Sequence, residues 1–384
     1  MEIDDSLIDI CNCCKGENMK VLYLSSNYES VQKHLVSSFN SNGLDAKLLI
    51  HMYRYNYDKE QNAKINYTYF IQSHIKGRGP IFYLTKLYFM ARRCKKICKN
   101  ERIELLHGNM MFGDGFICRY ISKKLNIPYI VSVRNSDLNT GFFWKFPWIK
   151  SIGYKNLYQA SAIVFLSQSY KQKLFHRLPE KIYRDIENKV YIIPNGIDDY
   201  FLDNINSSKN RPGNNVRIIF VGKINSNKNL EKTIEAVDIL RSNGRNVEVV
   251  AVGDILDDKY NDFFRKAYIQ HIPSCSKEEV CKHLRQADIF VMPSHSESFG
   301  LVYVEAMSQG LPVIYTRGQG FDGQFPEGYV GYAVSDYKAM EIAEKIECVI
   351  ENYEELSKHA VVAAKEFRWK NIADKLEEIY QSVI

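Results

Sequence analysis

Residues 294–307 read Ser294-His295-Ser296-Glu297-Ser298-Phe299-Gly300-Leu301-Val302-Tyr303-Val304-Glu305-Ala306-Met307. The apolar run just before them, residues 287–292, ends at a proline and predicts a short strand. Residues 300–308 predict a helix, and Gly310 and Pro312 supply its end. A strand, a glycine-containing turn and a helix in this order indicate an α/β fold.

The same stretch places one carboxylate on each side of the expected helix start. A helix N-terminus at Phe299 and Gly300 has unpaired backbone N–H groups and the positive end of the helix dipole, which favour a phosphate. Glu297 and Glu305 can accept hydrogen bonds from sugar hydroxyl groups on either side of it. The stretch therefore predicts a nucleotide-sugar site.

Strand and helix patterns alternate along most of the chain, which indicates parallel sheets covered by helices. The expected strands of a first half are residues 20–24, 46–51, 103–107, 129–133, 162–166 and 190–193, and those of a second half are residues 216–221, 247–252, 289–292 and 313–315. A polar stretch rich in Asn, Ser, Pro and Gly separates the two halves. The length of 384 residues suits two such domains.

The pattern around the two glutamates resembles the donor-site signature of the retaining GT-B glycosyltransferases of glycosyltransferase family 4. That pattern consists of Glu297 and Glu305 with seven residues between them, Phe299-Gly300 inside, and Ala306-Met307, Gly310 and Pro312-Val313 behind. Residues 191–198, Asp114-Gly115 and residues 127–129 resemble further parts of the family. The resemblance covers roughly residues 19 to 384, counted on motif matches.

The resemblance implies a GT-B architecture, in which two Rossmann-like parallel-sheet domains face each other across a cleft. The expected parts are a loosely held N-terminal extension (1–18), an acceptor-side domain (19–203), a linker (204–215), a donor-nucleotide-binding domain (216–366) and a terminal helix that crosses back to the first domain (367–384).

Two lysines follow the first strand of the second half, where the ligand crevice of such a fold lies. Gly222 is the position at which the backbone should approach a phosphate closely. Lys223 and Lys228 resemble the family's basic pair on the donor diphosphate, which neutralises the departing nucleoside diphosphate. The family often has arginine at the first of these positions, and lysine keeps the charge without the bidentate geometry.

The remaining donor-site residues are assigned by the same resemblance. Glu305 is expected to bind the ribose hydroxyl groups, and Glu297 to lie near the hydroxyl groups of the donor sugar. Ser298, Gly300 and Leu301 should approach the donor mainly through the backbone. Phe299 is either part of this contact or part of the core.

The first half departs from the family pattern after the strand at 129–133. Arg134 and Asn135 stand where many members carry a His-Gly pair before a similar Ser-Asp. Arginine does not act as a general base, so Arg134 is expected to act through hydrogen bonds and charge. Asp137 matches the family and is either a catalytic-site carboxylate or a helix cap.

The family resemblance implies retention of anomeric configuration without an enzymic nucleophile. No Asp-x-Asp sequence occurs in the chain, which fits a site that binds the diphosphate with lysines and a helix end instead of a metal ion. We therefore expect no metal and no cofactor beyond the nucleoside-diphosphate-sugar donor. A second motif, Gly318-x-Gly320-x-x-Gly323, fits the dinucleotide-binding pattern, but Pro326 and Gly328 follow where its helix should begin.

Residues 76–102 hold nine Lys and Arg against one acid, Glu101, interleaved with aliphatic and aromatic side chains. A basic amphipathic helix of this kind predicts either attachment to an anionic membrane surface or ordinary packing with a solvated face. Nucleic-acid binding is not expected, because the net charge is only +6 and no nucleic-acid-binding motif is present. Phe142, Phe143, Trp144, Phe146 and Trp148 either line an acceptor cleft or pack internally.

Composition is that of a globular protein, with 45% hydrophobic and 25% charged residues. No apolar run is long enough to span a membrane, and the acidic N-terminus lacks the pattern of a signal peptide. The nine scattered cysteines favour free thiols. We expect a cytoplasmic protein. If residues 76–102 attach to an anionic membrane surface, the protein would lie peripherally at the inner face of the cell membrane.

The sequence predicts a glycosyltransferase that moves a sugar from a nucleoside-diphosphate donor to a glycan or lipid-linked acceptor in cell-surface polysaccharide or glycoconjugate biosynthesis. An epimerase or phosphorylase of the same architecture is an alternative within the enzymes. A nucleotide-sugar-binding protein without catalysis is the alternative from another class, and Arg134 at the family's histidine position motivates it.

Overall fold

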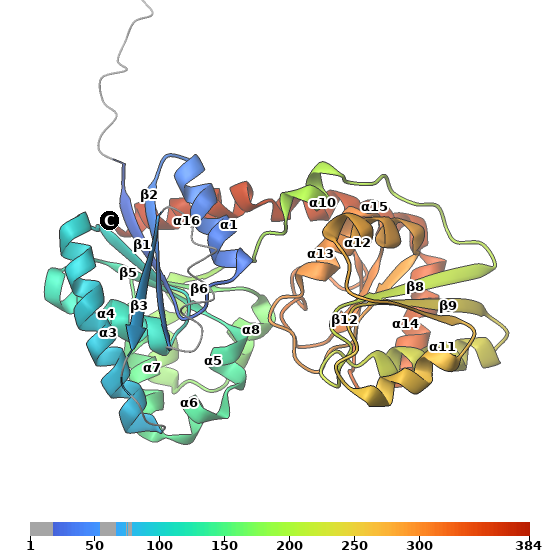
Figure 1. Cartoon of the computed structure of the whole chain (residues 1–384), viewed down its shortest axis with the longest axis horizontal. Helices are drawn as coiled ribbons and strands as arrows, with labels where there is room; N and C mark the ends of the chain where they lie inside the picture. Colours follow the sequence, from blue (N-terminus) through green and yellow to red (C-terminus); the bar gives the residue numbers. More distant parts are fainter. Residues whose placement is uncertain (1–17, 54–66, 74, 76–78) are drawn as a thin grey trace, which may run out of the picture.

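The computed structural model describes residues 18–53, 67–73, 75 and 79–384, and each half of the chain contains one parallel sheet (Figure 1). The first sheet has the strand order β3-β2-β1-β4-β5-β6-β7. Its strands are β1 (Lys20–Ser25), β2 (Asp45–Tyr53), β3 (Thr68–Ser73), β4 (Leu105–Gly108), β5 (Tyr129–Val133), β6 (Ala162–Phe165) and β7 (Val190–Ile192). The second sheet has the order β10-β9-β8-β11-β12-β13, with β8 (Asn215–Val221), β9 (Asn246–Val252), β10 (Ile269–Ile272), β11 (Ile289–Val291), β12 (Val313–Thr316) and β13 (Gly331–Val334).

Helices cover the faces of both sheets. In the first domain they are α1 (Ser30–Ser41), α3 (Pro80–Glu101), α4 (Gly113–Leu125), α5 (Asn135–Asn139), α6 (Gly141–Lys145), α7 (Pro147–Gln159), α8 (Gln168–Phe175), α9 (Glu180–Ile186) and η1 (Glu187–Lys189). The rest of the chain contains α10 (Asp199–Asp203), α11 (Leu230–Ser242), η2 (Asp258–Arg265), α12 (Lys277–Gln286), α13 (Leu301–Ser308), α14 (Ala339–Glu351), α15 (Tyr353–Ala364), η3 (Lys365–Phe367) and α16 (Trp369–Val383). Within the described residues, no helix is both long and apolar enough to cross a bilayer.

The strands expected from apolar runs are present in both sheets, and their parallel pairing confirms the prediction of two α/β domains. Three edge or near-edge strands, β3, β10 and β13, were not expected. They carry polar, aromatic or glycine residues, so they lack the continuous apolar run that identifies a buried central strand. β10 covers most of residues 270–273, a segment for which the sequence gives no strand pattern.

The last helix packs on the first domain, far from its neighbours in sequence (Figure 1). α16 places Trp369, Ile372, Ala373, Leu376, Ile379 and Tyr380 on one buried face, with the spacing of an amphipathic helix. This face joins Leu35, Val36 and Phe39 of α1 in the core on one side of the first sheet. The two domains are therefore linked twice, before β8 and again before α16.

The hydrophobic core of the second domain includes residues that precede the expected domain boundary at residue 203. Ile197, Phe201 and Leu202 pack with the second-domain core. The chain leaves the first sheet at Ile192 and enters the second core directly after Gly196. The short segment between them lies at the junction of the two domains, where it can line a site that both domains share.

Candidate active site

The helix that opens at Gly300 is built around a glycine-specific turn. Gly300 has a positive φ of 83°, and a Cβ atom there would lie 2.3 Å from the Tyr303 ring. A side chain at this position would therefore be strained and would clash. Glycine allows the chain to enter α13 sharply. The Tyr303 N–H donates to the Gly300 carbonyl at 3.0 Å, whereas the N–H groups of Leu301 and Val302, at the first two positions, lack a partner within the helix.

Residues 298–305 contribute side chains to two different cavities. Ser298 is exposed and lines the cleft between the domains, whereas Leu301 and Glu305 line a separate pocket on the other side of the helix start. Phe299 is 1% exposed and packs against Phe321 and Phe367. Of the two alternatives for Phe299, the core position is the one that the structure shows for its side chain.

Glu297 and Lys228 form an ion pair across this site, with 2.5 Å between Lys228 Nζ and Glu297 Oε2. The second oxygen of Glu297 accepts a hydrogen bond from the Ser298 N–H at 3.1 Å. Both side chains are mostly shielded, with 23% of Lys228 and 12% of Glu297 exposed. The structure thus brings together two predicted site residues that are 69 positions apart in sequence.

The loop after β8 leaves space in front of Gly222. Among the residues that the structure describes, and apart from its chain neighbours, the only heavy atom within 4 Å of a Cβ built on Gly222 is the Met292 sulfur at 3.8 Å. The backbone of Gly253 packs closely against Gly222, since a Cβ on Gly253 would lie 2.1 Å from the Gly222 carbonyl oxygen. Lys223 is exposed, and within the described residues it makes no hydrogen bond or ion pair. A ligand phosphate in front of Gly222 would meet an available cation.

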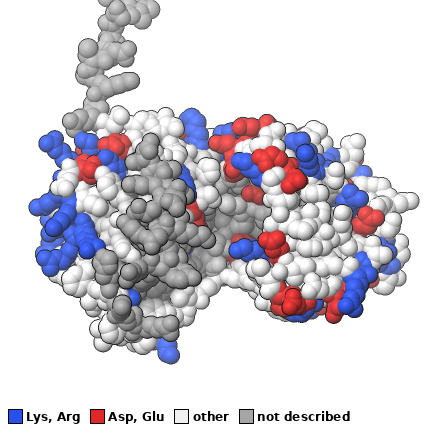
Figure 2. Space-filling view, in the orientation of Figure 1, with Lys and Arg blue, Asp and Glu red and all other residues white. Residues whose placement is uncertain are grey.

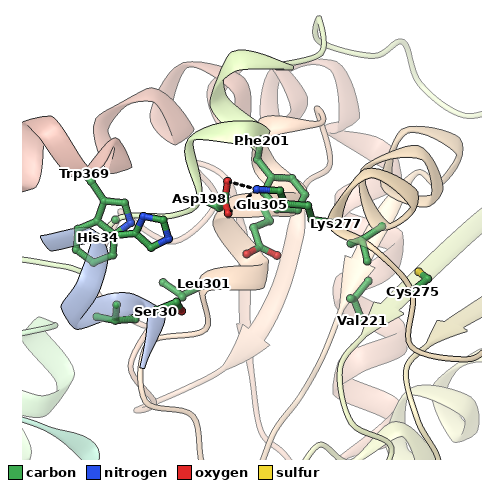
Figure 3. Close-up of a pocket in the computed structure, with 13 residues that line it drawn as sticks. Ser30, His34, Asp198, Phe201, Val221, Cys275, Lys277, Leu301, Glu305 and Trp369 are labelled. Carbon is green, nitrogen blue, oxygen red and sulfur yellow. Dashed lines mark hydrogen bonds and ion pairs between the residues drawn. The ribbon is translucent and has the colours of Figure 1, made fainter. Parts of the chain in front are cut away.

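Glu305 faces a pocket of about 330 Å³ between the domains (Figure 3). Burial, together with the nearby charge of Asp198, raises the pKa of the Glu305 carboxyl to about 7. Lys277 holds Asp198 with distances of 3.0 and 2.9 Å from its Nζ to the two carboxylate oxygens. In Figure 3 the Asp198–Lys277 pair lies beside Glu305 in this pocket.

The first domain and the terminal helix close the other side of the same pocket. His34 of α1 stacks on Trp369, with ring centroids 6.1 Å apart and planes 8° from parallel (Figure 3). Val221, Cys275 and Val280 supply apolar wall on the second-domain side. The pocket therefore combines a carboxylate, a flat aromatic pair and an apolar wall.

Sequence reasoning missed His34, Asp198, Lys277 and Trp369 as residues of this pocket. Asp198 ends the 191–198 segment that resembles the family, so that segment carried a signal, although no role was assigned to it. The other three come from α1, α12 and α16, and only the tertiary fold brings them together.

Arg134 lies at the bottom of the cleft and is held from three sides. Its Nε donates to the backbone and side-chain oxygens of Asn109 at 3.2 and 3.0 Å. Nη1 donates to Asn195 Oδ1 at 3.0 Å, and Nη2 donates to the Tyr23 hydroxyl at 3.3 Å. The guanidinium is thus fixed between the first sheet and the domain junction, and its positive charge faces the same cleft as Ser298.

Asp137 is fully buried, and its carboxylate is occupied by backbone N–H groups. Oδ2 accepts from Arg134 at 2.9 Å and from Met111 at 3.0 Å, and Oδ1 accepts from Phe112 at 3.3 Å. Burial raises the pKa of Asp137 to about 7, and these three donors oppose that rise. Asp137 lies in the first turn of α5 and not at its N-cap. From the first turn it holds the loop that carries Arg134.

The cleft between the domains is a second cavity, with a volume of about 280 Å³. Arg134, Asn135 and Asn195 line it from the first domain and the junction, and Ser298 lines it from the second. Asn135 Nδ2 donates to Ser296 Oγ at 3.1 Å across the domains, and the Tyr170 hydroxyl donates to the Glu297 carbonyl. These contacts hold the two halves of the site against each other, on either side of the hollow seen between the domains in Figure 2.

The glycine-rich motif at 318–323 packs against the backbone of Glu297 and Ser298. Turns occupy the segment where a dinucleotide-binding motif would begin its helix. Gly320 N–H donates to the Glu297 carbonyl at 3.2 Å, and a Cβ at Gly320 would lie 2.0 Å from the Ser298 carbonyl oxygen. The glycine therefore permits close packing under Glu297 and Ser298.

Chemically, residues 297–305 form a path along the chain between the two spaces. Leu301 and Glu305 line the pocket, Ser298 lines the cleft with Arg134, and Lys228 pairs with Glu297 next to Ser298. The pocket suits a nucleoside, the helix end and cations suit a diphosphate, and the cleft offers hydrogen-bond partners for a sugar. Among the described residues there is no cluster of three or more His, Cys, Asp or Glu able to hold a metal ion.

Models of known families match both halves of the chain. The model described as Glycosyltransferase Family 4 matches residues 29–200, and the model described as Glycosyl transferases group 1 matches residues 203–367. An uncharacterised glycosyltransferase from Methanocaldococcus jannaschii is 26% identical over 338 residues, which cover 84% of this chain and 87% of that protein.

Solved structures share the fold at low sequence identity. Sucrose-phosphate synthase from Thermosynechococcus elongatus is 14% identical, with a TM-score of 0.70 and coverage of 95% of this chain and 99% of that one. HepE from Anabaena, solved in complex with UDP, is 16% identical, with a TM-score of 0.68 and coverage of 95% and 100%. These similarities confirm the predicted architecture of two facing Rossmann-like domains.

Proposed function

We propose that this chain, which belongs to the GT-B glycosyltransferases of family 4, transfers a sugar from a nucleoside-diphosphate donor to a hydroxyl group of a glycan or lipid-linked acceptor. The observation that carries the proposal is the path from Glu305 to Arg134, in which the α13 N-terminus lies between a nucleoside-sized pocket and the cleft. The donor sugar would lie in the cleft and the nucleoside in the pocket.

The contacts of the site support a role for each predicted residue. Glu305 would accept hydrogen bonds from the ribose hydroxyl groups, since its carboxylate faces the pocket. Gly222, Gly300 and Leu301 would present backbone to the diphosphate, and Lys223 and Lys228 would neutralise it. Charge builds on the diphosphate as the glycosidic bond breaks, so cations already held in place would stabilise the transition state.

Glu297, Ser298 and Arg134 would act at the sugar end. Glu297 is fixed by Lys228 and can accept a hydrogen bond from a donor-sugar hydroxyl through its partly exposed side chain. Arg134 would hold the sugar or its phosphate by hydrogen bonds and charge, since it is itself held by Asn109, Asn195 and Tyr23. Asp137 would act on Arg134 through the backbone N–H that its carboxylate accepts.

We also propose that transfer proceeds with retention and without a metal ion, as the family resemblance implies. The supporting feature is that lysines and a helix end can balance the charge of the diphosphate.

A peripheral membrane location at the cytoplasmic face is part of the same proposal. α3 exposes Ile81, Phe82, Tyr88 and Phe89 next to its basic residues, and Figure 2 shows Lys and Arg gathered over the region of α3 and α4. Residues 76–78 of the predicted basic segment lie outside the described residues. Such a surface would bring a cell-surface glycoconjugate precursor on an anionic bilayer close to the cleft.

The first test is a thermal-shift screen of the purified chain with UDP, GDP, ADP, CDP and dTDP, with and without EDTA. UDP leads the screen because HepE was solved with UDP and with UDP-glucose. A ligand at a hundred times its dissociation constant adds about 2.7 kcal/mol of stability, which corresponds to several degrees. We expect one base to give the largest shift, unchanged by EDTA.

The matching nucleotide-sugar is then used in transfer assays, and the anomeric configuration of the product decides retention. Absence of a shift with every nucleotide would contradict the proposed donor site. Release of free sugar isomers without acceptor, or dependence on inorganic phosphate, would identify an epimerase or a phosphorylase instead.

A further inference from the structure

A third lined space, separate from the donor path, lies within the first domain. It has a volume of about 240 Å³ and sits where β1, β2 and β4 end, beneath α3 and beside the start of α4. Much of its wall is apolar, with Leu87 and Met90 from α3 and Phe143 from α6. We call this space the α3 pocket. Its position at the carboxyl ends of parallel strands is where ligands bind in open α/β sheets.

The α3 pocket adjoins the cleft that would hold the donor sugar. Met110 lines both spaces, and the neighbouring pairs Ser26–Asn27 and Ser136–Asp137 contribute one residue to each. A molecule that enters the cleft opposite Ser298 therefore has an apolar space directly beside it, on the first-domain side.

One imidazole provides a polar group in this largely apolar wall. His51 lies at the end of β2, is 4% exposed and lines the α3 pocket. Its Nε2 is 2.5 Å from Asp114 Oδ1, and Asp114 is fully buried. An ionised Asp114 would accept a hydrogen bond from Nε2–H, and in this neutral tautomer Nδ1 is a hydrogen-bond acceptor.

Within the described part of the chain, the contact with Asp114 is the sole hydrogen bond of the His51 ring. Nδ1 is therefore without a protein partner there. A carboxylate that orients a histidine and fixes its tautomer is the arrangement that prepares the opposite nitrogen for a hydroxyl group.

We propose that the α3 pocket is the acceptor subsite, that it takes an apolar portion of the acceptor, and that His51 Nδ1 accepts a hydrogen bond from an acceptor hydroxyl group. This inference rests on the proposed function and names the chemistry of its second substrate. The acceptor is a hydroxyl-bearing amphiphile, such as a sugar with an alkyl aglycone. The pocket is smaller than the roughly 300–1,000 Å³ of sites that enclose a whole small ligand, so it encloses part of the acceptor only.

The test compares octyl β-D-glucoside, below its micelle concentration, with methyl β-D-glucoside by saturation-transfer NMR on the full chain. Because an apolar wall favours the alkyl group, we expect the octyl compound to bind and its chain protons to receive the largest signal, with much weaker binding of the methyl compound.

Two variants localise this binding. The amide of His51→Gln can still reach Asp114 in place of Nε2, but the variant lacks a counterpart of Nδ1. Loss of one neutral hydrogen bond should weaken octyl glucoside binding by about two- to tenfold. Gly113→Ala adds a methyl group 3.1 Å from the Tyr83 hydroxyl, 3.8 Å from Leu87 Cδ2 and 4.0 Å from His51 Cε1, which narrows the pocket. It should weaken binding of the octyl compound as well.

The matched control is Ile81→Ser, because Ile81 is 73% exposed on α3 and does not line the pocket. It should leave octyl glucoside binding unchanged. Binding that Ile81→Ser abolishes and that both pocket variants keep would overturn the proposal and place the alkyl group on the outer face of α3. Absence of octyl glucoside binding to the parent would overturn it too.

The nucleotide shift separates this proposal from the one on which it rests. His51→Gln and Gly113→Ala should keep the parent's thermal shift with the selected nucleoside diphosphate. A normal nucleotide shift without octyl glucoside binding rejects the acceptor subsite alone, whereas loss of the nucleotide shift in the parent rejects the donor site.

Discussion

A substitution of Lys228 can remove a positive charge from the proposed diphosphate site while leaving Glu297 in place. It pairs with Glu297 at 2.5 Å, and Glu297 keeps a second hydrogen bond from Ser298. Lys228→Met should lower turnover by about 10²–10³, because loss of one preorganised group at a developing charge has effects of this size. Steady-state kinetics with the selected donor measures it.

Lys232→Met is the control, since Lys232 pairs with Glu235 on the surface of α11. It should leave turnover unchanged. Equal turnover in parent and Lys228→Met would show that the lysine has no part in leaving-group stabilisation.

Glu305 should make nucleotide affinity depend on pH. In the folded protein its pKa is raised from the usual 4.5 to about 7, so Glu305 is largely protonated at pH 6. A ribose hydroxyl donates better to the carboxylate than to the neutral acid, so affinity should rise with pH up to about 7 and then level off. The slope below the pKa is at most about tenfold per pH unit for one proton.

Calorimetric titrations of parent and Glu305→Gln between pH 5 and 8 provide the measurement. The glutamine variant should lose this part of the dependence. Stability is a less specific readout, because Asp137 also has a raised pKa of about 7. For both acids the folded state binds protons more tightly than the unfolded one, so their contribution to stability is full at low pH and falls as pH rises toward 7.

At the residue scale, the sequence predicts donor residues on one loop and helix, from Glu297 to Glu305, and the structure places these residues around the start of α13. Sequence reasoning could not find His34, Lys277 or Trp369, because these side chains come from three distant elements and none has a local pattern that differs from an ordinary helix. Arg134 was identified by its position, but its partners Asn109, Asn195 and Tyr23 depend on how β1, β4 and the junction meet.

At the scale of the element, α3 combines a buried apolar stripe with an exposed apolar and basic surface. One face of α3 is buried, as ordinary packing of this helix requires. Its buried residues are Leu87, Met90, Ala91, Cys94 and Cys98. Packing does not account for Ile81 and Phe89, which are 73% and 52% exposed. The helix thus packs on the domain and still presents a surface of the kind that binds membranes.

This surface predicts binding to anionic vesicles. The chain should sediment with vesicles that contain phosphatidylserine and not with purely zwitterionic ones, and salt should weaken the binding, since each basic residue near such a surface contributes about 1 kcal/mol. Phe89→Ser should reduce the bound fraction, whereas Lys232→Glu on α11 serves as the control. Equal sedimentation with both kinds of vesicle would contradict the role of charge.

Elements with strong apolar runs or long amphipathic patterns were predictable, and β3, β10 and β13 were not. An edge strand buries less of its surface and tolerates polar residues, so its sequence differs little from that of a loop. The 270–273 segment shows this, because Gln270 and His271 interrupt the apolar run of β10.

At the scale of the whole molecule, Gly196 controls how the terminal helix returns to the first domain. A Cβ at Gly196 would lie 2.6 Å from the Trp369 ring and 3.0 Å from the Phe367 carbonyl oxygen. Gly196→Ala should therefore displace the start of α16, lower the free energy of unfolding by about 1–3 kcal/mol and weaken nucleotide binding.

Urea unfolding and nucleotide titration measure the two effects. Gly213→Ala is the control, since nothing lies within 4 Å of its added Cβ, and it should match the parent in both. Parent-like stability of Gly196→Ala would contradict the close packing of Trp369 against the junction.

The central claim is that a nucleoside diphosphate bridges the Glu305 pocket and the cleft by way of the α13 N-terminus and the lysines. The most direct test is a calorimetric titration of the chain with the selected nucleoside diphosphate, its monophosphate and its nucleoside, in the presence of EDTA. The account predicts one-to-one binding in the order diphosphate, monophosphate, nucleoside, with the advantage of the diphosphate lost in Lys228→Met. Equal affinity for all three ligands, or no binding of the diphosphate, would contradict it.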